Sequence, residues 1–186
     1  MKIIAGTIVA ASLLLSACST TTYSNLNAET QPVAGMGYIG GEFVSQKSNF
    51  NPTLVLIRQG TQEEIPVHFS TALPTELRHT EVGLMRLQPG RYKVKGWVPM
   101  AGNNDRVVGK VFSDTLFQKE IEIRADTVVY LGKFFTTSKW TPSYPQEVIS
   151  VRVEAEKLST ENAHNKLSQE FPKLAAYNFD CLLCAK

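Results

Sequence analysis

The sequence predicts a mainly β protein: an antiparallel β-sandwich of about eight strands, followed by a C-terminal helix and a short tail with two cysteines. Residues 35–156 contain short runs in which apolar and polar residues alternate, separated by turn residues. This pattern is typical of strands with one face in a core and one face in solvent. Residues 157–186 contain apolar residues at helical spacing. We therefore expect one sandwich domain at 35–156, with residues 157–186 packed on it.

The alternation is clearest in three segments. The residues expected to point inward are Tyr92, Val94 and Val98 in 91–98, Phe117, Ile121, Ile123 and Ala125 in 117–125, and Ile149, Val151, Val153 and Ala155 in 149–155. Further strands are predicted at 38–44, 54–58, 65–69, 82–87 and 127–135. Residues 54–57 and 128–131 are apolar on both faces, so we expect them in central strands. Pro66 cannot donate a backbone hydrogen bond, so its strand should lie at a sheet edge.

A helix is predicted to begin near Ser159, which can cap its first turn, and Glu161 follows in that turn. One face of this helix would pack on the sandwich through Ala163, Leu167, Phe171, Leu174 and Ala175. Pro172 can interrupt the later part of the helix, because proline breaks helical hydrogen bonding.

The first 17 residues predict a signal peptide. Lys2 supplies a positive charge, residues 3–15 are mostly apolar, and Ser16 and Ala17 are small. The apolar run is shorter than a membrane-spanning helix, which needs about 20 residues, and no later run approaches that length. A mature transmembrane protein is therefore not expected.

The segment Leu15-Ser16-Ala17-Cys18 resembles the lipobox of bacterial lipoproteins. In these proteins the cysteine receives a diacylglycerol, the chain is cut before it, and the new amino terminus is usually acylated. The resemblance implies that Cys18 is the lipidation site, with acyl chains such as palmitate, and that a lipid bilayer is a partner. The alternative is an ordinary signal peptide with a chance cysteine.

The residues after Cys18 bear on where the protein is held. Ser19 follows the cysteine in place of Asp, which by the sorting preference of such lipoproteins implies the periplasmic face of the outer membrane. Residues 18–34 are polar and without period. They predict a lipidated N-terminus and a flexible tether that spans roughly 20 Å.

The two remaining cysteines, Cys181 and Cys184, lie in the C-terminal tail. An exported chain meets oxidising conditions, so we favour a local disulfide between them. A redox site or a zinc site stays an alternative. The first would need the pair at a helix start, and the second would need two further ligands.

Composition and motifs argue against several function classes. Removal of residues 1–17 leaves 18 basic and 17 acidic residues, so a nucleic acid partner is not expected. The glycines of 35–40 match G-x-G-x-x-G, but a strand follows them, so neither nucleotide nor another cofactor is expected. The chain contains no G-x-S-x-G or H-E-x-x-H motif. His68 and His79 have no recognisable nucleophile beside them, so we expect no catalytic site, no metal site and no enzyme.

The segment 87–94, Leu-Gln-Pro-Gly-Arg-Tyr-Lys-Val, resembles a hairpin of prealbumin-like and fibronectin-like sandwiches. The resemblance implies a tyrosine corner, in which the ring of Tyr92 enters the core and its hydroxyl bonds nearby backbone. Residues 125–134 are similar to a segment of poorly characterised proteobacterial lipoproteins. Such folds host binding, adhesion and assembly roles without shared catalytic residues.

Two long connections are candidate binding loops. Residues 99–114 include Asn103, Asn104 and Asp105, and residues 136–147 include Trp140 and Tyr144. Long loops with large aromatics on a rigid sandwich often build recognition sites. Alternatively, Trp140 and Tyr144 cover one end of the core.

A basic strip on the surface has two interpretations. Arg86, Arg91, Lys93 and Lys95 could face anionic lipid or glycan, or they could pair with acidic residues on neighbouring strands. We favour pairing within the sheet.

These observations favour a non-enzymatic binding or accessory protein of the cell envelope with a protein partner. Two alternatives remain. One is a periplasmic inhibitor or immunity-type protein, and the other is an envelope enzyme or redox protein that uses the C-terminal cysteine pair.

Overall fold

A computed structural model describes residues 25–46, 50–68, 79–101, 109–113, 120–141 and 148–185. Five predicted site residues lie outside these ranges: Cys18, Asn103, Asn104, Asp105 and Tyr144. What the sequence predicts for them stays a prediction.

Ten strands, one α-helix and one short 3-10 helix make up the described part of the chain. The strands are β1 (Gly37–Gln46), β2 (Phe50–Arg58), β3 (Glu64–Val67), β4 (His79–Leu87), β5 (Gly90–Ala101), β6 (Gly109–Ser113), β7 (Glu120–Ile123), β8 (Thr127–Thr141), β9 (Val148–Glu156) and β10 (Asn178–Cys181). The helices are α1 (Thr160–Glu170) and η1 (Pro172–Leu174). Neither helix of this described part is both long and apolar enough to cross a membrane.

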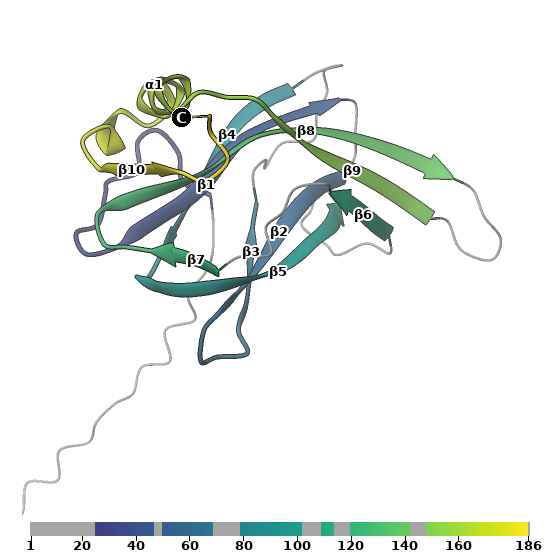
Figure 1. The fold of residues 1–186 in the computed structure, drawn as a ribbon, viewed down its shortest axis with the longest axis horizontal. Helices are drawn as coiled ribbons and strands as arrows, with labels where there is room; N and C mark the ends of the chain where they lie inside the picture. The colour runs from purple at the N-terminus through teal and green to yellow at the C-terminus, as the bar shows by residue number, and fades with distance from the viewer. Residues whose placement is uncertain are drawn as a thin grey trace, which may run out of the picture.

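The strands form two facing sheets, so the mainly β prediction is confirmed (Figure 1). Sheet A has the order β4-β1-β8-β9-β6, and β10 pairs with the first residues of β8. Sheet B has the order β3-β2-β5-β7. As predicted, β2 and β8 have neighbours on both sides, and β3, which contains Pro66, is an edge strand.

The prediction of an antiparallel sandwich is wrong for sheet A, which is mixed. β1 and β10 both run parallel to β8, and β6 runs parallel to β9. Between β1 and β8 the chain crosses between the sheets several times, since β4 and β6 belong to sheet A and the other intervening strands to sheet B, and β8 then runs in the direction of β1. Alternating apolar residues predict which side chains face the core. They do not predict whether a neighbouring strand that is distant in the sequence runs parallel or antiparallel.

Two apolar clusters stabilise the fold, one between the sheets and one beneath α1. The inner cluster includes Ile39, Phe43, Leu54, Leu56, Met85, Tyr92, Ile121, Val129, Leu131, Phe134 and Val153. The outer cluster includes Tyr38, Val82, Leu84, Val128, Tyr130, Ala163, Leu167, Phe171 and Leu174. Sheet A is therefore covered on both faces where α1 lies (Figure 1).

Helix α1 begins where its sequence predicts, but it ends before Phe171, Leu174 and Ala175, which were expected on its packed face. The side chain of Ser159 accepts a hydrogen bond from the backbone N–H of Asn162, which satisfies one of the free donors of the first turn. The helix ends at Glu170, and Pro172 begins the separate helix η1. Proline suits this position because its missing N–H is not needed in a first turn.

The predicted contact of the Tyr92 hydroxyl is confirmed. The hydroxyl donates to the backbone oxygen of Gln88 at 2.6 Å, and the side chain is buried between the sheets. Burial raises the pKa of Tyr92 above its ordinary value, because the charged phenolate would lose its hydration. The bond fixes the bend between β4 and β5.

Residues 25–33, which we call the N-terminal strap, lie against the domain. Asn25 forms an isolated antiparallel bridge with Met85 of β4. The N–H of Leu26 donates to the oxygen of Leu84 at 2.8 Å. The strap therefore enters the domain along the free edge of β4.

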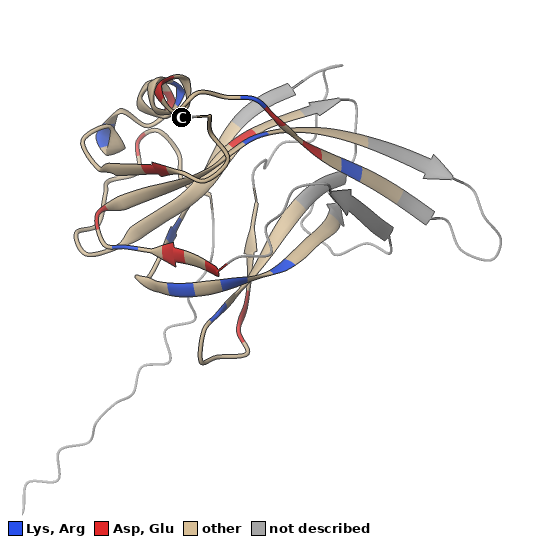
Figure 2. Cartoon of the chain, in the orientation of Figure 1, with Lys and Arg blue, Asp and Glu red and all other residues tan. Residues whose placement is uncertain are grey.

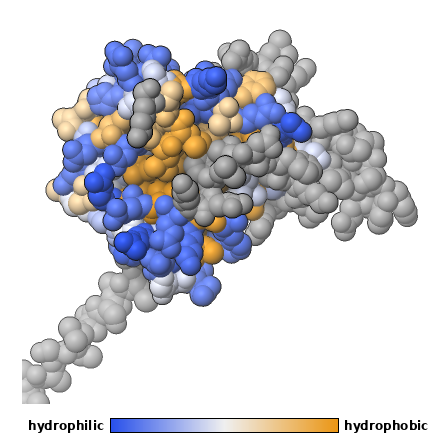
Figure 3. All heavy atoms as spheres, in the orientation of Figure 1, coloured by the Kyte–Doolittle hydropathy of each residue, from blue (hydrophilic) through white to orange (hydrophobic). Residues whose placement is uncertain are grey.

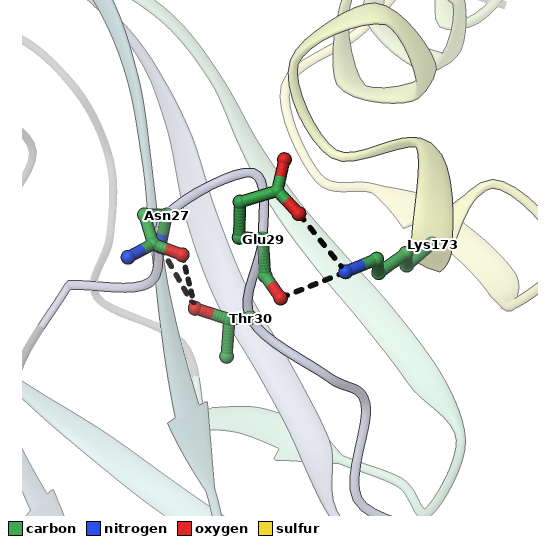
Figure 4. A network of polar contacts seen from close by, with 4 residues as sticks. All are labelled: Asn27, Glu29, Thr30 and Lys173. Atoms are coloured by element: carbon green, nitrogen blue, oxygen red, sulfur yellow. Dashed lines mark hydrogen bonds and ion pairs between the residues drawn. The ribbon is translucent and has the colours of Figure 1, made fainter.

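A second set of contacts fixes the strap to η1 (Figure 4). Lys173 donates to the backbone oxygen of Glu29 at 2.8 Å and lies 3.3 Å from its carboxylate oxygen Oε2. The hydroxyl of Thr30 donates to the side-chain oxygen of Asn27 at 2.9 Å and closes a small turn. The structure thus differs from the predicted flexible tether from Asn25 onward. Its contacts are polar bonds and the packing of one apolar side chain, Leu26, against the outer cluster, and these leave no periodic pattern in the sequence.

Candidate binding groove

An open groove of about 500 Å³ lies along one side of the sandwich, between β7 of sheet B and β10 of sheet A. Ile121 and Val129 line it from the inner cluster. Figure 3 shows a band of hydrophobic residues on this face, between hydrophilic surfaces above and below. The groove is larger than the narrow pocket between the N-terminal strap and helix η1.

The sheet B wall of the groove is β7, whose sequence alternates Glu-Ile-Glu-Ile. Ile121 and Ile123 are buried, with 4% and 1% of their surface exposed. Glu120 and Glu122 point to the other face and are exposed. Among the described strands β7 is the last of sheet B, so one of its edges faces the groove.

Basic residues of β5 lie beside this wall. Arg91 and Lys93 are directly opposite Glu122 and Glu120 in the antiparallel register, and opposite charges in such positions attract. Figure 2 shows the basic β5 and the acidic β7 side by side. The prediction that these basic residues pair within the sheet agrees with this register.

The sheet A wall is β10 and the tail that follows it. Cys181 and Cys184 form a disulfide, with their Cα atoms 5.5 Å apart. Between them, Leu182 is 45% exposed and donates its N–H to the oxygen of Tyr130 at 2.9 Å. Leu183 points the other way and packs against the inner cluster.

The tail also approaches β8 closely. A Cβ atom on Gly132 would lie 3.1 Å from Cβ of Leu183, and the φ angle of Gly132 is +133°. Both facts require glycine at this position. Beyond the disulfide, the N–H of Ala185 donates to the oxygen of Leu158 at 2.9 Å. The disulfide loop is therefore fixed on both sides by the fold.

One ion pair bridges the two walls. Arg124, just after β7, contacts the carboxylate of Asp180 in β10. Both side chains are about half exposed, so the pair contributes little to stability, about 0–1 kcal/mol. It does fix the separation of the walls at this end, while Glu120 and Glu122 line the rest of the rim.

The predicted binding loops take a different form where the structure describes them. Trp140 belongs to β8 by its backbone and lies opposite Ile149 of β9, so its placement in a connecting loop is wrong. β6 likewise falls inside the predicted connection 99–114. Residues 136–139 are polar and hide the strand pattern, although threonine favours strands.

Two other titratable groups, His68 and Glu42, contact polar or charged side chains within the fold. Nδ1 of His68 lies 3.1 Å from the hydroxyl of the buried Thr53, and desolvation lowers the pKa of this histidine. Lys133 lies 3.7 Å from the buried Glu42 and 2.8 Å from Glu156, which compensates the buried carboxylate. The described residues hold no group of three or more His, Cys, Asp or Glu side chains that could bind a metal ion.

Sequence reasoning missed the groove. The alternation in β7 and the cysteine pair in the tail were both visible, but they are distant in the sequence and no local signal places them side by side. The sequence gives a partial indication of a binding surface in Leu182, an apolar residue between two cysteines in the C-terminal tail. The chain matches no protein-family model, no curated protein and no solved structure.

Proposed function

We propose that this chain is a lipid-anchored, non-enzymatic binding protein of the bacterial cell envelope, and that its groove receives another envelope protein. Cys18 holds it by acyl chains on the periplasmic face of the outer membrane. The groove carries the proposal: it combines apolar residues on the floor, charged residues on the rim and a strand edge along one wall. Protein-binding surfaces use this combination of an apolar centre and a polar rim.

The position of the strap supports this arrangement. From Cys18 to Asn25 the chain advances 25 − 18 = 7 residues, which span at most about 25 Å when extended. The strap joins the domain at β4, which is one edge of sheet A. The groove lies on the other side of β1 and β8, next to β10. A chain attached to the bilayer at Cys18 would enter the domain at the β4 edge, and the groove at the other edge would stay accessible to a partner.

Membrane attachment is tested by Cys18→Ser. We expect the variant to leave the membrane fraction while its circular dichroism spectrum stays that of the folded protein, because Cys18 precedes every contact described for the domain. Mass spectrometry of the unsubstituted protein should show acyl chains on Cys18. A variant that still sediments with membranes would contradict the anchor.

Partner binding at the groove is tested by photo-crosslinking in intact cells. A photoreactive residue replaces Leu182, which is 45% exposed in the groove, and in a matched control it replaces Arg152, an exposed residue of β9 outside the groove. We expect a discrete protein adduct from position 182 alone. Equal adducts from both positions, or none from 182, would contradict the groove as the binding site.

A second candidate function has one specific observation in its favour: the disulfide of Cys181 and Cys184 lines the same groove. An envelope redox protein would exchange this disulfide with a dithiol on its substrate. The test is incubation of the oxidised protein with a reduced dithiol peptide, followed by thiol labelling. Labelling of Cys181 and Cys184 at the rate of peptide oxidation supports this candidate, and unlabelled cysteines exclude it.

A further inference from the structure

The edge of β7 offers backbone groups to an added strand. In an antiparallel ladder, successive residues of a strand direct their N–H and C=O groups to alternate sides. β5 uses one side of β7, from Gly90 opposite Ile123 to Lys93 opposite Glu120. The other side faces the groove, since β7 ends sheet B. An extended segment placed there would form main-chain hydrogen bonds with β7.

β5 shows which side chains suit a neighbour of β7. Opposite Glu122, Ile121 and Glu120 it places Arg91, Tyr92 and Lys93, in that order. This is a basic, apolar, basic pattern. The basic residues lie on the outer face with the two carboxylates, and the apolar residue lies on the inner face. A strand added on the other side of β7 would lie opposite the same alternation of glutamate on the outer face and isoleucine on the inner face.

A second copy of β7 does not suit this position. Self-pairing that keeps Ile121 on the inner face would set glutamate directly opposite glutamate on the outer face. Like charges at such positions destabilise a sheet. A shift by one residue would avoid this contact only by turning the isoleucines of one strand outward.

The opposite wall of the groove suits an apolar side chain. Leu182 is 45% exposed there, and the partly buried Phe179 and Cys181 lie beside it. An inward side chain of an added strand would cover this surface together with Ile121. Burial of apolar surface contributes about 25 cal/mol per Å², so this wall adds to the main-chain bonds.

We propose that the groove binds an extended segment of the partner protein as a fifth strand of sheet B, with basic residues beside Glu120 and Glu122 and an apolar residue between them. The inference rests on the proposed function, because it names the part of the partner that the groove receives. The main-chain bonds supply affinity, and the two glutamates with Leu182 select the sequence.

The probe is the peptide Ser-Lys-Val-Lys-Val-Lys-Ser, acetylated and amidated, titrated into the ¹⁵N-labelled chain from residue 18 onward with Cys18→Ser. We expect amide shift changes concentrated in β7. The double variant with Glu120→Gln and Glu122→Gln should raise the Kd about tenfold, because two cross-strand charge pairs are lost. Glu154→Gln, at an exposed acid of β9 that pairs with Arg152, is the matched control and should leave the Kd unchanged.

Two further peptides separate strand addition from general charge attraction. A version with glutamate in place of lysine should not bind. A version N-methylated at alternate backbone nitrogens keeps the charges but loses main-chain donors, and it should not bind either. Equal binding of the methylated peptide, shift changes spread over other acidic surfaces, or dimerisation through β7 in place of peptide binding would each overturn the inference.

The outcome for this inference is separate from that for the proposed function. If position 182 crosslinks to a partner in cells but the lysine peptide does not bind, the groove is a binding site and strand addition is wrong. If position 182 yields no adduct in cells, the proposed function fails, whatever the peptide does.

Discussion

Lys173 donates to the backbone oxygen of Glu29 at 2.8 Å and also lies 3.3 Å from its carboxylate. The two residues are 144 positions apart in the sequence. One side chain near the end of the chain thus fixes the first segment that the structure describes. The strap is held by this contact, by the edge of β4 and by the bond from the N–H of Val33 to the hydroxyl of Tyr38 at 2.8 Å.

Replacement of Lys173 should loosen the strap without unfolding the domain. In Lys173→Met we expect the amide of Leu26 to exchange faster with solvent, because its bond to Leu84 would lose the neighbouring contact. The free energy of unfolding should fall by only about 0.5 kcal/mol, as is usual for partly exposed charge pairs. Amide hydrogen exchange and urea denaturation measure the two effects. Lys166→Met, which removes a pair with Glu170 inside α1, should leave Leu26 unchanged.

A side chain at Gly132 should destabilise the fold more than a side chain at Gly96 does. Gly132→Ala introduces both an unfavourable φ angle and a 3.1 Å approach to Leu183. Gly96 is a matched control, with a φ angle of +137° and nothing within 4 Å of a Cβ. We expect Gly96→Ala to cost about 1–3 kcal/mol and Gly132→Ala to cost about 1 kcal/mol more.

A double-mutant cycle separates the two contributions at Gly132. Adding Leu183→Gly to Gly132→Ala should remove the excess cost, because Cβ of Leu183, the atom 3.1 Å away, is then absent, while the backbone cost remains. Urea denaturation of the four proteins gives the coupling energy. A coupling energy of zero would show that Leu183 does not pack on Gly132.

Loss of the disulfide should have a modest effect on stability. The variant with Cys181→Ser and Cys184→Ser opens a ring of only four residues, for which chain entropy predicts a loss of about 2 kcal/mol. The amides of β10 should exchange faster, and the rest of sheet A should not. Denaturation with and without reductant checks this, and reductant should have no effect on the serine variant. A loss of the whole fold on reduction would contradict this prediction.

Stability should decrease at mildly acidic pH because of His68. Burial lowers the pKa of this histidine below 6.5 in the folded protein, so the unfolded chain binds its proton more readily. The contribution is fully present above pH 6.5 and is lost as the pH falls from there toward the lowered pKa. In His68→Gln the free energy of unfolding should vary less with pH across this interval. Urea denaturation at several pH values between 5 and 8 tests this, and an unchanged slope would contradict it.

The sequence predicted those elements whose signals are local. The alternation at 149–155 marks β9, Pro66 marks an edge, and Ser159 marks the start of α1. β10 has four residues without clear alternation, so it was missed. The parallel pairing of β1 with β8 depends on how the strands between them are distributed over the two sheets, and no short pattern encodes this.

The groove could not be predicted for the same reason. Its two walls are built by Ile121 in sheet B and by Leu182 in the tail after β10, and only the packing of the folded chain brings them together. The predicted loop residue Trp140 lies in a strand, because pairing with Ile149 continues through a polar stretch. Pairing between strands decided the result for Trp140, and packing between sheets decided it for the groove.

The parallel pairing of β1 with β8 also bears on the order of events during synthesis. Tyr38 can pair with Val128, and Glu29 can contact Lys173, only after most of the chain has been synthesised. Such distant pairings form late and slowly. For a chain exported amino terminus first, as proposed, Cys18 reaches the membrane well before the domain can close. Cleavage and acylation would then act on an unfolded chain, and folding would begin on a protein already attached to its bilayer.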